Sequence, residues 1–299
     1  MTIKGKTFLI TGGTGFIGSH TAKALVEKGA HVVIVSRTKS KENAVHGAKL
    51  YRLNLSSPRI ENIFKKEKPD YVYHFASNLL AVKEFDPTAD AQTVLDSVNL
   101  LKNASKFGVK KFIFSSTGAV YGNNAPQPTS ETQSANPENP YVLSKYVVEN
   151  YLNFYKQSTG MPYVVLRYSN VYGPKQKTGA LAYYARALGS NEQAEIPGDG
   201  SQTRDYVFID DVVRANVMAL KVPNDFKDPI FNVSTGKETS LNKAYEMIAK
   251  ILKKEAHPIF IPSKISEQSR YCLNSSKLNK AVGWKAQTNL EKGLKQTLV

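Results

Sequence analysis

Short apolar runs alternate with longer amphipathic stretches over residues 1–169 of the chain. The runs are continuous in Val, Ile, Leu, Phe and Tyr, which is typical of strands that are buried on both faces of a parallel sheet. We expect such strands at residues 7–11, 31–36, 71–76, 111–116 and 163–169. Helical periodicity occupies the intervals at residues 16–29, at 88–107 and from about residue 141 onwards. This order of strands and helices predicts an α/β fold built on a doubly wound parallel sheet.

The pattern changes after residue 170. Segments rich in Gly and Pro, such as NVYGPKQKTG and IPGDGSQTRDY, alternate there with helices that we expect near residues 210–221 and 241–254. Short mixed elements of this kind indicate a smaller α+β part. We therefore predict two domains, residues 1–169 and residues 170–299, with the helix near 210–221 packing back on the first.

Charge and composition narrow the possible partners. Forty Lys and Arg against 25 Asp and Glu give a net charge of +15, which would suit a small anionic ligand. The lysines are scattered, with no basic arm and no aromatic-rich RNA-binding signature, so we expect no nucleic-acid partner. No apolar run approaches the roughly 18 residues of a membrane span, so we expect no membrane partner either. Cys272 is the single cysteine and excludes an intramolecular disulfide, so a reducing cytoplasm is the simplest location.

A glycine-rich segment joins the first predicted strand to the first predicted helix. Gly12, Gly15 and Gly18 have the spacing G-x-x-G-x-x-G, with Phe16 and Ile17 beside them. A tight turn needs residues without Cβ, and a pyrophosphate needs close backbone N–H groups at a helix N-terminus. The segment therefore predicts a dinucleotide site, and a bare strand–helix turn is the alternative.

The end of the second predicted strand bears on which dinucleotide binds. A carboxylate there would accept a hydrogen bond from the adenosine ribose, whereas an arginine would accommodate a 2′-phosphate. The chain has Ser36 and Arg37, then Thr38 and Lys39, with no acid before Glu42. NADP is therefore favoured over NAD, although Arg37 could also be a solvent-facing loop residue. Asn54, in the segment RLNLSS, ends a further strand that we expect between those at 31–36 and 71–76, and it could accept a hydrogen bond from the adenine amino group.

Hydroxyl groups and a Tyr-x-x-x-Lys pair follow the strand at 111–116. Ser115 and Thr117 come at its carboxyl end, where open α/β sheets place their ligands. Tyr141 and Lys145 lie one turn apart on the next predicted helix, which begins at a proline. An ammonium near a phenol favours the phenolate, so we expect a pKa of Tyr141 lowered towards neutrality. Spacing alone leaves open whether this is an acid/base pair or two ordinary residues of an amphipathic helix.

The order of the motifs resembles that of the extended short-chain dehydrogenase/reductases, in the sugar-nucleotide epimerase/dehydratase branch. The resemblance spans nearly the whole chain and ends in SSKLNKAVGW at residues 275–284. Its motifs are TGGTGFIG, SSTGAVYG, PYVLSK, LRYSNVYGP and GDGSQTRDYVFIDDV. It implies a Rossmann-type sheet, a bound NAD(P), a small-molecule sugar nucleotide as substrate, and a homodimer formed through the helices at 88–107 and 141–157.

The resemblance also implies the roles of the site residues. Tyr141 would take the proton of a sugar hydroxyl, Lys145 would lower its pKa and bind the nicotinamide ribose, and Thr117 would hold the sugar oxygen. Further residues assigned to the cofactor site are Leu55, Phe75, Ala76, Ser115 and Tyr168.

On the substrate side, the resemblance points to Asn170 and to Arg204, whose guanidinium fork suits a pyrophosphate. A surface ion pair with Asp205 or Asp210 is the alternative for Arg204. The chain departs from the family where relatives place a second arginine. Here it reads KISEQSRY, so that Lys264 or Arg270 would take over the contact. Thr93 is a second departure, at a position where relatives often carry asparagine.

Several reactions remain open within this family. Gly118 and Ala119 stand where dehydratases resemble one another in carrying an Asp-Glu pair, which argues against elimination of water. We favour a nucleoside-diphosphate-sugar 4-epimerase of the UDP-hexose type, which oxidises C4 transiently. An NADPH-dependent 4-ketoreductase is the alternative that Arg37 supports. A non-catalytic dinucleotide-binding scaffold would be expected to lack Tyr141 or Lys145, and the chain has both.

Overall fold

The computed structural model describes residues 2–38, 43–77, 87–262 and 269–298. The chain divides into two compact units. The first comprises residues 1–120, 135–167 and 213–231, and the second comprises residues 121–134, 168–212 and 232–299. Each unit is therefore assembled from separate stretches of the chain.

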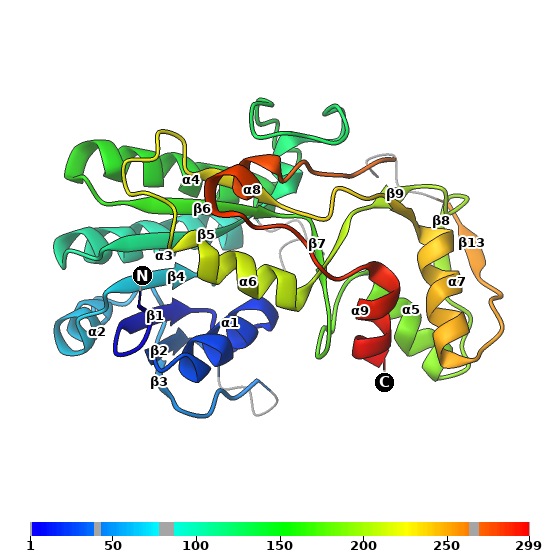
Figure 1. Ribbon diagram of the computed structural model, residues 1–299, viewed down its shortest axis with the longest axis horizontal. Coiled ribbons are helices and arrows are strands. Elements are labelled where there is room, and N and C mark those ends of the chain that lie inside the picture. Colours follow the sequence, from blue (N-terminus) through cyan, green and yellow to red (C-terminus); the bar gives the residue numbers. More distant parts are fainter. Residues whose placement is uncertain (1, 39–42, 78–86, 263–268, 299) are drawn as a thin grey trace. The chain divides into compact units, whose positions relative to one another are not determined.

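A seven-stranded sheet in the described part of the chain organises the first unit, in the order β11-β6-β5-β4-β1-β2-β3 (Figure 1). Its strands are β1 (Thr7–Thr11), β2 (His31–Ser36), β3 (Ala48–Arg52), β4 (Tyr71–His74), β5 (Lys111–Thr117), β6 (Tyr163–Tyr168) and β11 (Ile230–Val233). The four pairs from β5 to β3 are parallel. The order runs outward in both directions from β1 and β4, which is the doubly wound arrangement. The fold class predicted from the sequence is confirmed.

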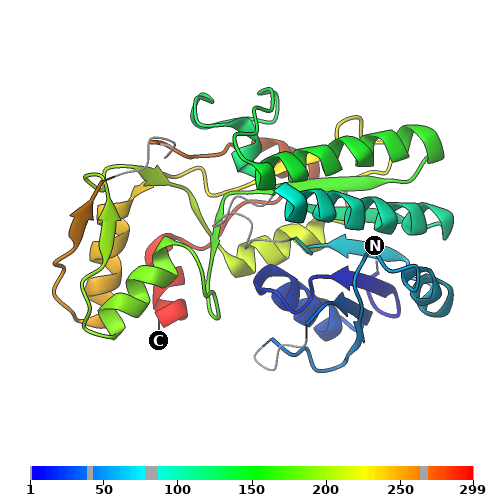
Figure 2. The ribbon, with the colours of Figure 1, turned by 180° about the vertical axis from the view of Figure 1, so that it is seen from behind.

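Helices cover both faces of this sheet (Figures 1 and 2). On one face lie α2 (Ile60–Glu67), α3 (Pro87–Lys106) and α4 (Pro140–Thr159), and on the other lie α1 (Phe16–Glu27) and the C-terminal part of α6 (Ile209–Ala219). Asn216 of α6 donates a hydrogen bond to the Thr21 hydroxyl of α1 over 2.9 Å. Asn216 also accepts, at its carbonyl, a hydrogen bond from Tyr73 of β4 over 2.8 Å. These bonds hold the end of α6 against the sheet.

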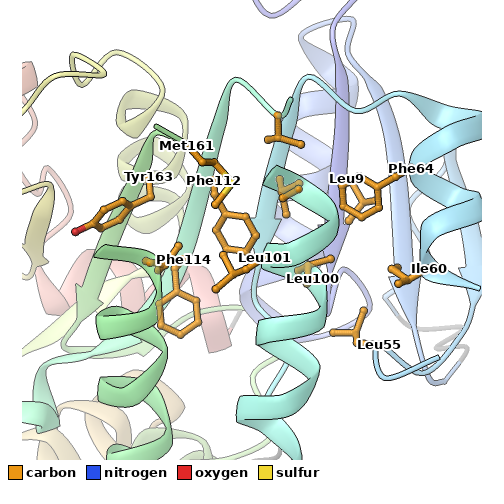
Figure 3. Close-up of a cluster of buried hydrophobic side chains, with 14 of the residues drawn as sticks. Leu9, Leu55, Ile60, Phe64, Leu100, Leu101, Phe112, Phe114, Met161 and Tyr163 are labelled. Atoms are coloured by element: carbon orange, nitrogen blue, oxygen red, sulfur yellow. The ribbon is translucent and has the colours of Figure 1, made fainter. Parts of the chain in front are cut away.

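The main apolar core lies between the sheet and α2, α3 and α4 (Figure 3). Phe64, Leu100, Leu101 and Phe112 are fully buried in it. Successive residues of β1 and β5 point to opposite faces of the sheet. Because both faces are covered, both sets of side chains are apolar, which explains the continuous apolar runs in the sequence.

The second unit is a mixture of short elements. In this unit α7 (Leu241–Leu252) packs against both α5 (Ala180–Gly189) and α9 (Leu290–Leu298). Helix α8 (Ser276–Val282) precedes α9 in the chain. Its paired strands are β7 (Asn170–Tyr172) with β10 (Tyr206–Phe208), β8 (Glu195–Pro197) with β13 (Ile259–Ile261), and β9 (Thr203–Arg204) with β12 (Thr239–Ser240). No helix in the described residues is long and apolar enough to cross a membrane.

Candidate active site

The turn after β1 requires glycine for steric reasons. Gly12 has a φ of +67°, and a Cβ on it would lie 2.7 Å from the backbone nitrogen of Ala76. A Cβ on Gly18 would clash with the carbonyl oxygen of Gly12. Gly15 precedes the first residue of α1 and donates its N–H to the Gly12 carbonyl over 2.9 Å. The turn therefore brings bare backbone to a helix N-terminus, and it fits a dinucleotide pyrophosphate.

A buried histidine holds the strand next to this turn in place. The Ser97 hydroxyl donates to the Thr93 carbonyl over 2.7 Å, so its oxygen accepts from Nε2 of His74 over 2.8 Å. Nδ1 of His74 is then the acceptor for the Thr11 hydroxyl, at 2.6 Å. Thr11 in turn accepts from the backbone N–H of Ala76 over 3.3 Å. This relay ties the ends of β1 and β4 to the middle of α3 where Gly12 meets Ala76.

The pKa of His74 is lowered to about 3, first by burial and then by the positive charge of Lys145. The histidine is therefore neutral in the folded protein. Because both ring nitrogens are engaged, the tautomer with the proton on Nε2 is fixed by the donors and acceptors around it.

Tyr141 lies in the first turn of α4. Asn139 caps this helix through its side chain, which accepts the backbone N–H of Val142 over 2.9 Å. The Tyr141 phenol forms a hydrogen bond with the hydroxyl of Ser77. Ser77 directly follows Ala76, the residue against which the glycine turn packs. The phenol therefore reaches the same end of the sheet as the predicted dinucleotide cradle.

Lys145 is almost fully buried one turn further along α4. Its Nζ donates to the carbonyl oxygen of Ser115 over 2.9 Å and lies 4.9 Å from the centre of the Phe114 ring and 5.9 Å from that of Tyr141. Burial lowers the pKa of Lys145 to about 8, and the charge of Glu149 opposes the shift. The ammonium is thus retained near neutral pH although it has lost its water.

The predicted effect of this ammonium on the phenol is wrong for the folded chain. The pKa of Tyr141 is raised to about 12 because burial dominates, with a smaller contribution from the charge of Asp90 and an opposing one from Ser77. Desolvation of the phenolate outweighs an ammonium that lies 5.9 Å from the ring. Tyr141 is accordingly a neutral phenol in this structure.

The end of β2 carries the two residues expected at the adenosine ribose. The Ser36 and Thr14 hydroxyls hydrogen-bond over 2.7 Å, which links β2 to the glycine turn. Arg37 is exposed. Burial raises the pKa of Asp96 on α3, and the positive charge of Arg37 opposes this rise. Lys39 and Glu42 lie outside the described residues.

The remaining residues assigned to the cofactor differ in exposure. Asn54 is exposed, whereas Leu55 is buried in the core and its carbonyl accepts a hydrogen bond from Asn99 over 2.6 Å. Phe75 is half-buried and stacks on Tyr73 with ring centres 5.7 Å apart. Phe16 and Ile17, in the first turn of α1, are half-buried too. Thr117 is half-buried at the end of β5, and its hydroxyl accepts the backbone N–H of Ala119 over 3.2 Å.

Residues assigned to the substrate lie in the second unit. Arg204 is half-buried on β9 opposite Thr239 of β12, and its guanidinium donates to the Thr203 carbonyl over 2.7 Å. The next residue, Asp205, is fully buried. Its carboxylate accepts the backbone N–H and the hydroxyl of Thr235 over 3.0 and 2.6 Å. This buried carboxylate fixes the strand that presents Arg204.

The other residues assigned to ligands in this unit have diverse surroundings. Asn170 is exposed at the start of β7. Tyr168 is buried, and its carbonyl accepts from Tyr271 over 3.3 Å. Arg270 is exposed and forms a two-pronged ion pair with Glu238, at 3.0 Å from Nε and 2.6 Å from Nη2. Lys264 lies outside the described residues.

The glycine turn, the Tyr-Lys pair and the doubly wound sheet together define a Rossmann-type enzyme that binds a nicotinamide dinucleotide. The model of the NAD dependent epimerase/dehydratase family matches residues 8–234. The chain belongs to this family, and the resemblance noted in the sequence is confirmed.

Individual relatives agree with this assignment. The chain is similar to a UDP-glucose 4-epimerase of Mycolicibacterium smegmatis, with 32% identity over 97% of the chain and 96% of the relative. Among solved structures it is similar to UDP-glucose 4-epimerase of Thermotoga maritima with UDP-glucose, with 36% identity, a TM-score of 0.93, and coverage of 98% and 97%. It is also similar to the Thermus thermophilus UDP-glucose 4-epimerase complex with NAD, with 33% identity, a TM-score of 0.88, and the same coverage.

Sequence reasoning missed four residues that shape the site: Ser77, His74, Glu149 and Asp205. Their signals are weak, because a hydroxyl after a strand or a single acid on a helix is common in any protein. For His74 a signal existed, since a histidine in an otherwise apolar strand must be satisfied by buried partners.

We expect His74 to make the first unit labile in mild acid. Its pKa is about 3 in the fold. In the unfolded chain it is about 6.5, so only the unfolded state gains a proton as the pH falls. The free energy of unfolding should therefore be lower at pH 5 than at pH 7 by about 2 kcal/mol from this residue alone. Urea titrations at both pH values should show this difference shrinking by that amount in His74→Gln. An unchanged difference would contradict the prediction, and His31→Gln, at an exposed position, is the control.

Proposed function

We propose that the protein is a nucleoside-diphosphate-sugar 4-epimerase of the UDP-hexose type. The observation that carries the proposal is the position of Tyr141, whose phenol bonds Ser77 beside the glycine turn while Lys145 is buried one turn further on. An alcohol oxidation needs a proton acceptor next to a hydride acceptor. Tyr141 would be the proton acceptor, and the glycine turn would hold the dinucleotide that accepts the hydride. The relatives named as UDP-glucose 4-epimerases support the same reaction.

The chain's own groups perform the proton chemistry. A nicotinamide dinucleotide held at the turn of Gly12, Gly15 and Gly18 would supply reversible hydride transfer at C4 of the sugar. Tyr141 removes the proton of the C4 hydroxyl and returns a proton after the 4-keto sugar has rotated to present its opposite face. The Lys145 ammonium, held 5.9 Å from the ring centre by its bond to the Ser115 carbonyl, would offset part of the cost of burying the phenolate. Thr117, at the end of β5, holds the sugar oxygen. On the second unit, Asn170, Arg204 and Arg270 bind the diphosphate or the sugar.

Other reactions of the family fit the chain less well. Elimination of water would require carboxylates near Thr117, whereas Gly118 and Ala119 follow it in a short helical turn. A 4-ketoreductase would use the same Tyr141, Lys145 and Thr117 once and release oxidised cofactor. Arg37 is the observation that favours this second candidate, because a net reduction draws on NADPH.

Turnover without added reductant separates the two candidates. We expect interconversion of UDP-glucose and UDP-galactose, or of their N-acetyl forms, with the purified protein. Tyr141→Phe should lower kcat by about 10² or more because the proton acceptor is lost. Consumption of NADPH with a 4-keto sugar, without interconversion, would identify the reductase instead. Tyr146→Phe, on the same helix, is the matched control and should retain activity.

We also propose that the cofactor is NADP rather than NAD. Arg37 is exposed directly after β2, next to the Ser36 hydroxyl, so a guanidinium and a hydroxyl are available for a 2′-phosphate. Asp96 on α3 interacts with the same guanidinium and would help to orient it.

Arg37→Ala tests this preference. We expect the affinity for NADP to fall by about tenfold or more, because the charge that pairs with the phosphate is gone, while the affinity for NAD stays the same. Arg59→Ala, an exposed arginine outside the site, should change neither. Calorimetric titration of the protein freed of cofactor measures both constants. Tighter binding of NAD to the unaltered protein would refute the preference.

We further propose a homodimer formed through α3 and α4. The two helices pack along each other on one face of the sheet (Figure 2). Their outer surface exposes Leu95 by 62%, Leu143 by 50% and Phe154 by 63%. Large apolar side chains gathered on neighbouring helices are typical of a contact with another chain. A second copy supplies the same surface and would bury both sets.

Phe154→Asp should convert the dimer to a monomer, since a carboxylate would be buried in the interface. Light scattering coupled to gel filtration measures the molar mass directly. Phe260→Asp is the matched control, because Phe260 is 54% exposed on β13, a strand of the second unit. A monomeric unaltered protein, or a Phe154→Asp variant that stays dimeric, would contradict the proposal.

A further inference from the structure

A buried glutamate continues the line of functional residues along α4. Tyr141, Lys145 and Glu149 follow one another at intervals of four residues, which places them on one face of the helix. Glu149 is almost fully buried, as Lys145 is. Neither the proposed reaction nor the family motifs assign it a task.

Glu149 joins the helix to two neighbouring strands. Its Oε2 pairs with Nη2 of Arg167 on β6 over 2.5 Å, and its Oε1 accepts from Nε of the same side chain over 3.1 Å. The Ser116 hydroxyl of β5 donates to Oε1 over 2.5 Å. The carboxylate is therefore held by a guanidinium fork and a hydroxyl, which is a rigid arrangement.

The contacts of Glu149 lie next to those of Lys145 and Thr117, the two residues whose positions matter for the proposed reaction. Ser115 accepts the Lys145 ammonium at its carbonyl, Ser116 is bound to Glu149, and Thr117 is the residue expected to hold the sugar. A shift of the Glu149 carboxylate would therefore move the last three residues of β5 against α4. Positioning of Lys145 and Thr117 thus depends on the same contact.

The charges around Lys145 make Glu149 important for its protonation as well. Glu149 on its own helix opposes the loss of the ammonium. His74 on β4 faces Lys145 and is neutral, because its pKa is about 3. Tyr141 is a neutral phenol. Arg167 on β6 is positive and is paired with the Glu149 carboxylate. Glu149 thus supplies negative charge to a cation that has little water.

We propose that Glu149 is a positioning residue that, together with Arg167 and Ser116, keeps Lys145 protonated and aligned with the end of β5. The proposal rests on the function proposed above, because alignment of Lys145 and Thr117 is useful only if both act in the reaction. Glu149 would act through its contacts with Ser116 and Arg167.

The double variant Glu149→Gln/Arg167→Gln is the main test. It removes both charges together, so that no buried charge is left alone, and it can preserve the hydrogen bond from Ser116. We expect a folded protein whose kcat falls by about tenfold or more and whose alkaline limb in kcat/KM moves to lower pH. Glu61→Gln, at a half-buried glutamate that pairs with Lys65, is the control and should keep the profile of the unaltered protein.

A second readout does not need turnover. In protein labelled with ¹³C at lysine Cε, the Lys145 signal is assigned by its loss in Lys145→Arg and titrated by NMR. We expect a midpoint near 8 in the unaltered protein and a lower one, by about half a unit or more, in the double variant. An unchanged midpoint together with an unchanged pH profile would overturn the proposal and leave the pair as a support of the fold. If the unaltered protein turns over no sugar nucleotide, the proposed function fails, and the NMR titration still decides the effect of Glu149 on Lys145.

Discussion

Removing a lysine ammonium from water is costly, and the candidate site depends on how this chain compensates for it. Lys145 donates to a strand carbonyl, lies over the Phe114 ring and has the Glu149 carboxylate one turn away on its own helix. The first two of these contacts require α4 to lie against β5 in one register. The same register places Tyr141, at the start of the helix, near the end of β4. Compensation for a buried charge and placement of the acid/base are thus one requirement.

His74, next to the Lys145 ammonium, is neutral for a related reason. His74 bridges Thr11 and Ser97 without taking a proton, so its uncharged ring adds no repulsion to Lys145. Thr11, in turn, binds the backbone of Ala76, against which Gly12 packs too closely for a side chain. The geometry of the glycine turn and the electrostatics around Lys145 therefore share one histidine. A substitution of His74 would therefore alter both the glycine turn and the charge balance around Lys145.

Much of this arrangement could be predicted from local sequence signals. The strand at residues 7–11, the three glycines and the helix that starts at Pro140 are encoded by residues next to one another, so apolar runs and turn residues were sufficient to find them. The Glu149–Arg167 pair, in contrast, joins residues 18 positions apart on different elements, and nothing in the sequence marks either as a partner. The pKa of Tyr141 depends on the amount of protein around the phenol, which motif spacing does not encode. Arg270 was predicted from its place near a family motif, and its ion pair with Glu238 depends on the path of the chain.

The chain passes from one compact unit to the other at five points, after residues 120, 134, 167, 212 and 231. The first unit is consequently not a continuous segment of the chain, and no single cut yields it whole. Recombination at one point could not exchange the second unit while keeping the first intact. A change confined to one unit therefore has to be made by substitutions or insertions at several separate places along the chain.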